Sequence, residues 1–253
     1  FNAIDFERTA TSLETPMAED EISPYLGFTF DVNEDIVAYA SYSDIYEPQD
    51  KYDFDEQYLA PTKGKNYELG VKSEWLDDRL LATLAVFKAE QLGIGTRAGI
   101  NDKGRTYYTG QDVYSEGIEL EVAGQLNDYT TVSFGATYID LEDKSGDSAY
   151  TWIPEERLTF SVYQEVPSLP GLTLGLTGSW QSETSNGDSN HAIPVKQGSY
   201  LLADAFARWS FSNDSYLQAN VSNITDEKHI TSLYWVGYYG ADRNYSLSYA
   251  YKF

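Results

Sequence analysis

The sequence predicts an all-β protein that folds as one antiparallel up-and-down sheet. Residues that favour strands are abundant, because aromatic residues make up 15% of the 253 positions and tyrosine alone occurs 22 times. Apolar and polar residues alternate along about eleven stretches, which is the period of a strand with two different faces. Short and long polar connections alternate strictly between these stretches, so all short turns are expected at one end of the sheet and all long loops at the other.

Each expected strand is a stretch in which large apolar side chains recur at every second position. The tight turns between them contain Asn, Asp, Gly or Pro, which suit hairpin backbone angles. These turns are "VNED" (32–35), "LDDR" (76–79), "LNDY" (126–129), "SLPG" (168–171) and "SNDS" (212–215). The longer connections are 45–63, 92–105 with its flexible "GIGTRAG", 142–150, 185–197 and 225–242. The expected strands, in chain order, are 24–32, 35–44, 64–76, 80–91, 106–126, 129–141, 151–166, 171–184, 198–212, 215–224 and 243–253.

One face of the expected sheet is apolar and the other is polar. In the last strand, Tyr245, Leu247 and Tyr249 alternate with small polar residues. Across the strands, small and aliphatic residues fill the middle of the apolar face and aromatic residues its ends, as a bilayer and its interfaces select. The opposite face mixes charged residues with Gly and Thr, which suits a water-filled lumen. The expected membrane-interface residues are Trp75, Trp209, Phe211, Tyr249, Tyr251 and Phe253.

These patterns predict a portion of a transmembrane β-barrel, because a bilayer forbids open sheet edges. Two soluble folds show related patterns. A sandwich also alternates apolar and polar residues, and a propeller repeats about every 40–45 residues. A propeller fits four strands into each repeat, however, whereas each repeat here holds two. Either soluble fold would be well folded in buffer without detergent.

Composition excludes several functions. The net charge of −23 argues against nucleic acid as a partner, because phosphate binding needs a basic face. The sequence has no cysteine, which excludes disulfides and thiolate metal sites. The two histidines, His191 and His229, lie in long loops, so we expect no catalytic residues and no enzyme. The acidic loop 47–58 lacks the spacing of a calcium loop, so we expect solvated charges and no metal site there.

Several motifs resemble the barrel of TonB-dependent ferric-siderophore receptors. In residues 39–91 a Tyr-x-Pro-Gln loop precedes a Pro-x-x-Gly-x-x-Tyr-Glu-x-Gly-Val-Lys strand. Those positions are Tyr46, Pro48, Gln49, Pro61, Gly64, Tyr67, Glu68, Gly70, Val71 and Lys72. Further matching stretches follow in order: "SEGIELEVAGQL" (115–126), "IPEERLTFSVYQ" (153–164), "LQANVSNITDEKH" (217–229) and "YGADRNYSLSYAYKF" (239–253).

The resemblance implies an outer-membrane receptor that takes up ferric siderophores, energised through the TonB complex. It implies that residues 24–253 form the carboxy-terminal half of a roughly 22-stranded barrel, that residues 1–23 form part of an extracellular loop, and that the plug domain through which TonB acts is absent from these residues. No cofactor is implied, because the siderophore carries the iron. Outer-membrane lipid and the barrel assembly machinery, which would read the terminal Phe253, are the further partners. Haem, cobalamin or glycan cargo and a passive channel remain alternatives.

The ligand-binding residues are expected in the loops, where aromatic rings and cations can grip a bulky chelate by stacking and cation–π contact. The segment "SLYWVGYYG" (232–240) is the densest aromatic cluster. The expected binding residues are Tyr234, Trp235, Tyr238 and Tyr239 of this segment, with Trp152, Arg97 and Tyr46 from other loops.

Overall fold

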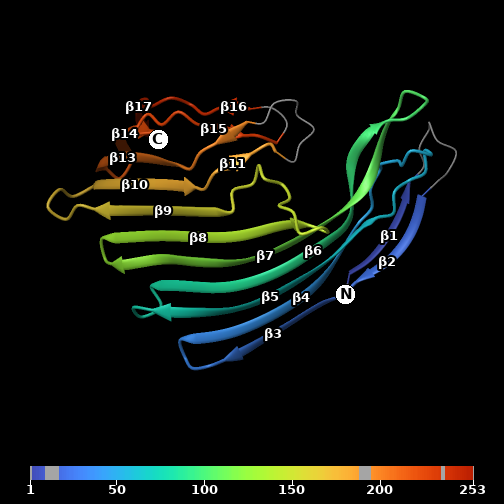
Figure 1. The fold of residues 1–253 in the computed structure, drawn as a ribbon. Helices are drawn as coiled ribbons and strands as arrows, with labels where there is room; N and C mark the ends of the chain where they lie inside the picture. The colour runs from blue at the N-terminus through green and yellow to red at the C-terminus, as the bar shows by residue number, and fades with distance from the viewer. Residues whose placement is uncertain (1, 9–16, 188–194, 235–236, 253) are drawn as a thin grey trace.

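The computed structural model describes residues 2–8, 17–187, 195–234 and 237–252, and they form one large antiparallel sheet with three small hairpins (Figure 1). Within the described part of the chain, no helix is long and apolar enough to cross a membrane. Each strand of the large sheet pairs with its neighbours in the chain, and β3 and β17 are the two edges. The strands are β3 (Tyr25–Asp31), β4 (Ile36–Glu47), β5 (Thr62–Trp75), β6 (Leu80–Ile100), β7 (Thr106–Asn127), β8 (Thr130–Asp143), β9 (Glu156–Glu165), β10 (Leu172–Gln181), β13 (Tyr200–Ser212), β14 (Ser215–Ser222) and β17 (Asn244–Tyr251).

The eleven predicted strands and their up-and-down order are confirmed. The five short turns lie at one end of the sheet and the long connections at the other (Figure 1). In the turn after β5, Leu76, Asp77 and Asp78 all adopt left-handed backbone angles, with φ between 57° and 62°. A single sheet of eleven strands excludes the propeller and the two-sheet sandwich for this part of the chain.

Residues 2–8 and 17–23, within the segment expected to form part of an extracellular loop, form the hairpin β1 (Asn2–Arg8) and β2 (Met17–Ser23), which lies at the loop end of the sheet (Figure 1). Two predictions about other segments were wrong. Much of 92–105, expected as flexible loop, continues β6 and β7 into a long hairpin that is paired up to Ile100 and Thr106. The strand expected from 151 begins only at Glu156, because Pro154 has no N–H to donate to a ladder.

Two further hairpins belong to the loop end. In one, β11 (Thr184–Ser185) pairs with β12 (Lys196–Gln197), and in the other β15 (Ile230–Ser232) pairs with β16 (Tyr238–Tyr239). Apart from Thr184, which was expected to end the preceding strand, both hairpins lie inside the long polar connections predicted from the sequence.

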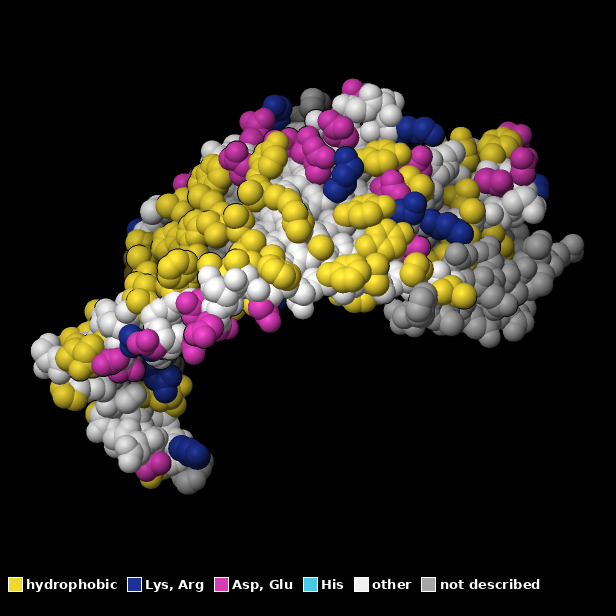
Figure 2. All heavy atoms as spheres, turned by 90° about the horizontal axis from the view of Figure 1, so that it is seen from below, with side chains coloured by type: hydrophobic (Ala, Val, Ile, Leu, Met, Phe, Trp, Pro, Cys, Tyr) yellow, Lys and Arg dark blue, Asp and Glu magenta, His cyan; other side chains and the backbone are white. Residues whose placement is uncertain are grey.

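The two faces of the sheet differ as predicted. Cross-strand neighbours on the apolar face include Leu84 opposite Leu120 and Ala219 opposite Leu247. No large side chain among the described residues is fully buried, and Leu247 is 70% exposed. Hydrophobic side chains gather in a broad area of the surface (Figure 2). A soluble sheet would cover such a face with a second layer; here the described protein supplies none.

Aromatic residues line the turn end of the apolar face. Phe211 lies between two others, with its ring centroid 6.0 Å from that of Trp209 and 6.2 Å from that of Tyr249. Trp75 and Tyr251 are also more than half exposed. This arrangement suits a bilayer interface, where rings have one wet and one apolar side. Phe253 lies outside the described residues.

On the polar face, charged side chains contact tyrosines of neighbouring strands. The hydroxyl of Tyr39 donates to Oε1 of Glu68 at 2.5 Å, and the ammonium of Lys72 lies 5.3 Å from the Tyr39 ring centroid. The guanidinium of Arg208 lies 3.9 Å above the ring centroid of Tyr216. Such a face requires water or a polar partner against it.

Candidate ligand-binding site

The connection between β14 and β17 folds back over the polar face of the sheet, and Asn223 holds both of its ends. The backbone N–H of Asn223 donates to Oδ1 of Asp204 on β13 at 2.7 Å. Its side-chain amide donates to the carbonyl oxygens of Glu227 and Ala241 at 3.0 and 3.1 Å, and its Oδ1 accepts from the N–H of Glu227 at 2.8 Å. Asn223 has a φ of 52°, which Asn tolerates better than most residues.

His229 is packed into the same loop rather than presented to solvent. His229 is only 5% exposed, and its ring centroid lies 4.7 Å from that of Tyr200 on β13. Gly240 lies flush against the imidazole, because a Cβ at that position would approach Cε1 to 2.0 Å. A cavity of about 340 Å³ lies beside this contact and is lined in part by Asp204, Asp242 and Thr231.

An exposed ion-pair cluster closes the base of the loop. The ammonium of Lys228 lies 2.5 Å from Oδ1 of Asp242 and 3.5 Å from Oδ1 of Asp226. The hydrogen bond to Asp242 raises the pKa of Lys228. The backbone N–H of Arg243 donates to Asp226 at 3.0 Å, and this bond lowers the pKa of the Asp226 carboxyl. These contacts fix the path of the chain into β17.

Three aromatic rings from two loops form a row at the loop end. The ring centroids of Tyr150 and Trp152 are 5.0 Å apart, and those of Trp152 and Tyr234 are 5.1 Å apart. Tyr150, one of the aromatic residues that the sequence places in the loops, joins the row from a residue with a left-handed backbone, φ 54°. The row joins connections that are far apart in the chain and gives a stacking surface for a flat or bulky ligand.

The other predicted binding residues lie in three different settings. Tyr238 and Tyr239 are on β16, where Tyr239 is 83% exposed. Arg97 is on the long hairpin, opposite Tyr108. Tyr46 is buried, with the ammonium of Lys63 5.6 Å from its ring centroid. Trp235 lies outside the described residues. The structure therefore brings together Trp152 and Tyr234 and separates Arg97 and Tyr46 from them.

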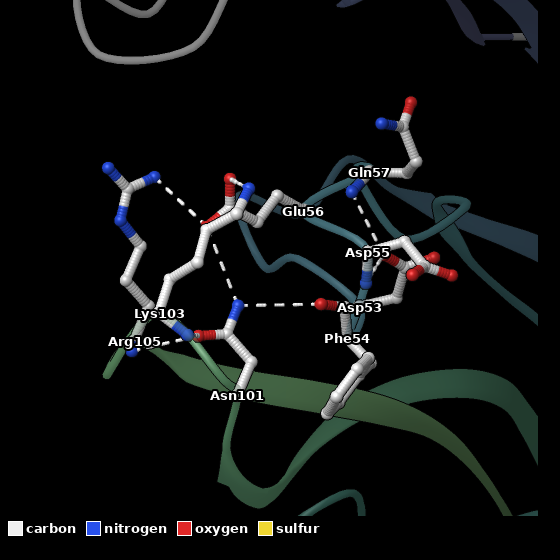
Figure 3. Close-up of polar contacts among 8 residues, drawn as sticks. All are labelled: Asp53, Phe54, Asp55, Glu56, Gln57, Asn101, Lys103 and Arg105. Carbon is white, nitrogen blue, oxygen red and sulfur yellow. Dashed lines mark hydrogen bonds and ion pairs between the residues drawn. The ribbon is translucent and has the colours of Figure 1, made fainter.

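Loop 48–61, which holds most of the acidic stretch 47–58, is fastened to the long hairpin through Glu56, so this one charge is paired where solvated charges were expected (Figure 3). Oε2 of Glu56 lies 2.9 Å from the ammonium of Lys103, and Oε1 lies 3.2 Å from Arg105. The Glu56 side chain is only 15% exposed. The hydrogen bond from Lys103 lowers the pKa of the Glu56 carboxyl.

Two further contacts secure the same loop. The ring of Phe54 meets that of Tyr107 edge-on, with centroids 5.2 Å apart. The side chain of Gln49 donates to the carbonyl oxygen of Gly93 at 2.8 Å and accepts from the N–H of Gly95 at 3.0 Å. Among the residues the structure describes, no cluster of three or more acidic or histidine side chains has a metal-binding arrangement.

Comparisons with known proteins agree with this architecture. Residues 4–224 match the family model described as TonB dependent receptor-like, beta-barrel. The chain is 32% identical over 240 residues to the ferripyoverdine receptor of Pseudomonas aeruginosa, covering 89% of this chain and 29% of that protein. It is 28% identical over 223 residues to the ferrioxamine B receptor of Salmonella typhimurium, covering 83% of this chain and 31% of that protein.

A similar structure has also been solved. The crystal structure of the Pseudomonas aeruginosa ferripyoverdine receptor bound to ferripyoverdine superposes with a TM-score of 0.87 at 29% identity, covering 98% of this chain and 35% of that one. The chain thus spans about a third of the length of these relatives.

Proposed function

This chain belongs to the TonB-dependent receptor-like β-barrel family, and from that membership we propose that it forms part of the wall and the capture loops of a receptor for ferric siderophores. Barrels of this family lie in the outer membrane, and the uncovered apolar face of the eleven-stranded sheet suits that solvent. One observation carries the proposal. The uncovered apolar face of the sheet adjoins, at one end only, loops that present a row of aromatic rings.

Capture falls to the row of Tyr150, Trp152 and Tyr234, with Tyr238 and Tyr239 nearby in sequence. Aromatic rings bind a bulky chelate through stacking and apolar contact without contributing a ligand to the iron, which stays within the siderophore. The net charge of −23 gives little attraction to an anionic chelate, so a neutral or cationic chelate such as a hydroxamate type suits these loops better.

Transport requires parts beyond the described sheet. Its edge strands, β3 and β17, are unpaired with one another, and a bilayer does not tolerate open edges. We propose that further strands close the barrel, that a plug occupies its lumen against the polar face, and that the TonB complex drives release of the cargo. No catalytic step is part of this function.

Uptake of radiolabelled ferric siderophore tests the proposal. The full receptor would be expressed in cells that lack other siderophore receptors, with and without a proton-motive force. We expect energy-dependent uptake of a hydroxamate chelate. At low concentration it should be weakened about 5- to 160-fold in a Trp152→Ala, Tyr234→Ala variant, because each ring contributes about 0.5–1.5 kcal/mol to stacking. Trp75→Ala, at the turn end, is the matched control. Energy-independent uptake would indicate a passive channel, and normal uptake by the double variant would exclude this capture surface.

A further inference from the structure

Three connections at the loop end of the sheet are joined to one another, although they are far apart in the chain. They are the β8–β9 connection (144–155), the β10–β13 connection (182–199), which contains β11 and β12, and the β14–β17 connection (223–243). The first and third supply the rings of the aromatic row. The second contains no Tyr, Trp or Phe, yet it is bonded to both of the others.

Thr151 lies between the two ring-bearing residues of the first connection and is bonded twice to β11. Its carbonyl oxygen accepts from the N–H of Ser185 at 2.8 Å, and its hydroxyl donates to the carbonyl oxygen of Ser185 at 3.1 Å. Ala149 and Thr184, each only 5% exposed, line one small cavity between the two connections. Because Thr151 directly precedes Trp152, these bonds hold that ring relative to β11.

The other strand of the same small hairpin reaches the third connection. Gln197 lies on β12, and its Oε1 accepts from the N–H of Ile230 at 2.8 Å. Its amide nitrogen donates to the carbonyl oxygen of Gly198 at 2.9 Å, which fixes the direction of the side chain. Ile230 begins β15, and Leu233, only 4% exposed, anchors the segment that continues to Tyr234.

The rings and the small hairpin therefore join the outer two connections in two places. The ring centroids of Trp152 and Tyr234 lie 5.1 Å apart, and β11 with β12 links the residues that precede them in the chain. A ligand that stacks on loops free to separate must order them, and this ordering weakens its binding. Loops that are held together beforehand avoid that loss.

We propose that the β11–β12 hairpin is a bridge that positions the capture surface, so that the three connections bind a ligand as one preorganised unit. Thr151, Ser185 and Gln197 are positioning residues, because they fix the spacing of Trp152 and Tyr234 through bonds within the protein. The inference rests on the proposed function, since it assigns these residues to the same capture surface. It also implies that a change in one connection alters the others.

Hydrogen exchange of the full receptor in detergent, without ligand, tests the bridge itself. Gln197→Ala removes the acceptor of the Ile230 N–H. It should raise the exchange of that amide by about 2- to 13-fold, the loss of one hydrogen bond expressed as an equilibrium ratio. The same variant should also raise exchange in residues 149–153, which belong to a different connection. Unchanged protection of residues 149–153 would overturn the proposal.

A matched control and a reciprocal variant complete this experiment. Gln164 lies at the turn end of β9 and accepts from the hydroxyl of Thr130 at 2.8 Å, so Gln164→Ala removes a comparable hydrogen bond far along the strand. It should leave exchange in both loop segments as in the parent. Thr151→Val, which removes the hydroxyl bonded to Ser185, should raise exchange in β15 and β16, and parent-like exchange there would contradict the coupling.

Binding of a radiolabelled ferric trihydroxamate to de-energised cells tests the effect on capture. Gln197→Ala should weaken binding severalfold, up to about 13-fold, because the binding-competent arrangement of the loops is less populated. In a Trp152→Ala, Tyr234→Ala background the same substitution should change binding by less than about twofold, because no rings remain to be positioned. Equal weakening in both backgrounds would show a merely structural role and overturn the proposal.

The outcomes separate this inference from the proposed function. If the double ring variant weakens binding and Gln197→Ala does not, the bridge is wrong and the capture surface stands. If the double ring variant binds as the parent does, or the parent binds no chelate, the capture surface is wrong and the positioning role falls with it.

Discussion

Replacing Leu84 with arginine would place a cation at the centre of the apolar face. Leu84 lies on β6 between Val71 and Leu120 of the neighbouring strands and is 47% exposed. It is midway along the apolar row of β6, between Leu80 at the turn end and Lys88 at the loop end. A cation at mid-depth in a barrel wall costs about 2–4 kcal/mol. The folding equilibrium of Leu84→Arg should therefore fall about 30- to 800-fold.

Two matched variants isolate the membrane contribution. Thr83→Arg introduces the same side chain one residue away, on the polar face between Lys72 and Glu121. Its cost should stay within about 1 kcal/mol, as expected for a wet surface. Leu80→Arg, at the turn end, should cost about 0–1 kcal/mol, because the penalty falls toward the interface.

Reversible urea unfolding of the full receptor in lipid vesicles, followed by tryptophan fluorescence and by the gel shift of the folded barrel, gives these free energies. We expect the free-energy cost of Leu84→Arg to be far above the costs of Leu80→Arg and Thr83→Arg. Equal costs on the two faces, or a Leu84→Arg variant as stable as the parent, would refute the assignment of this face to hydrocarbon.

The remaining predictions concern the loops. Lys103 lowers the pKa of the Glu56 carboxyl, so attachment of loop 48–61 is favoured above the ordinary carboxyl pKa and is lost as pH falls through the lowered value. Hydrogen exchange, expressed as amide protection relative to the intrinsic rate at each pH, should show this loss in the parent. The Glu56→Gln variant should show low protection of the loop at every pH. Asn223→Ala should destabilise its loop by about 1–3 kcal/mol through lost hydrogen bonds, seen as faster exchange, and exchange at the parent rate would contradict it. Gly240→Ala should displace His229, and an unchanged imidazole resonance in NMR would contradict this contact.

The strands were predictable because one physical constraint acts along all of them. A bilayer on one side and a polar environment on the other force alternation, and the pattern of β17 from Tyr245 to Tyr251 is its clearest case. The long hairpin was missed where that constraint ends. Between Gly93 and Ile100 the hairpin extends beyond the apolar band and loop 48–61 packs against it, so alternation ceases although pairing continues across two register shifts.

The binding surface was predictable in composition but not in arrangement. The sequence shows that aromatic residues crowd the loops, yet the contact of Trp152 with Tyr234 depends on how two connections fold over the sheet. The same holds for Glu56, whose partners Lys103 and Arg105 belong to another hairpin. The alternation of residues along a strand indicates which solvent each face contacts. No comparable pattern in the sequence indicates which loops contact one another.

The sheet has almost no interior of its own, since its apolar side chains remain uncovered by the described protein. If the chain collapsed in water, its apolar side chains could be buried only against another copy of the same chain. Acquiring native structure and entering the bilayer are therefore a single event for this segment, and the lipid acts as a component of its energetics. The stability of any substitution on that side is a property of the protein and its host membrane together, so it will change when the membrane's thickness or headgroups change.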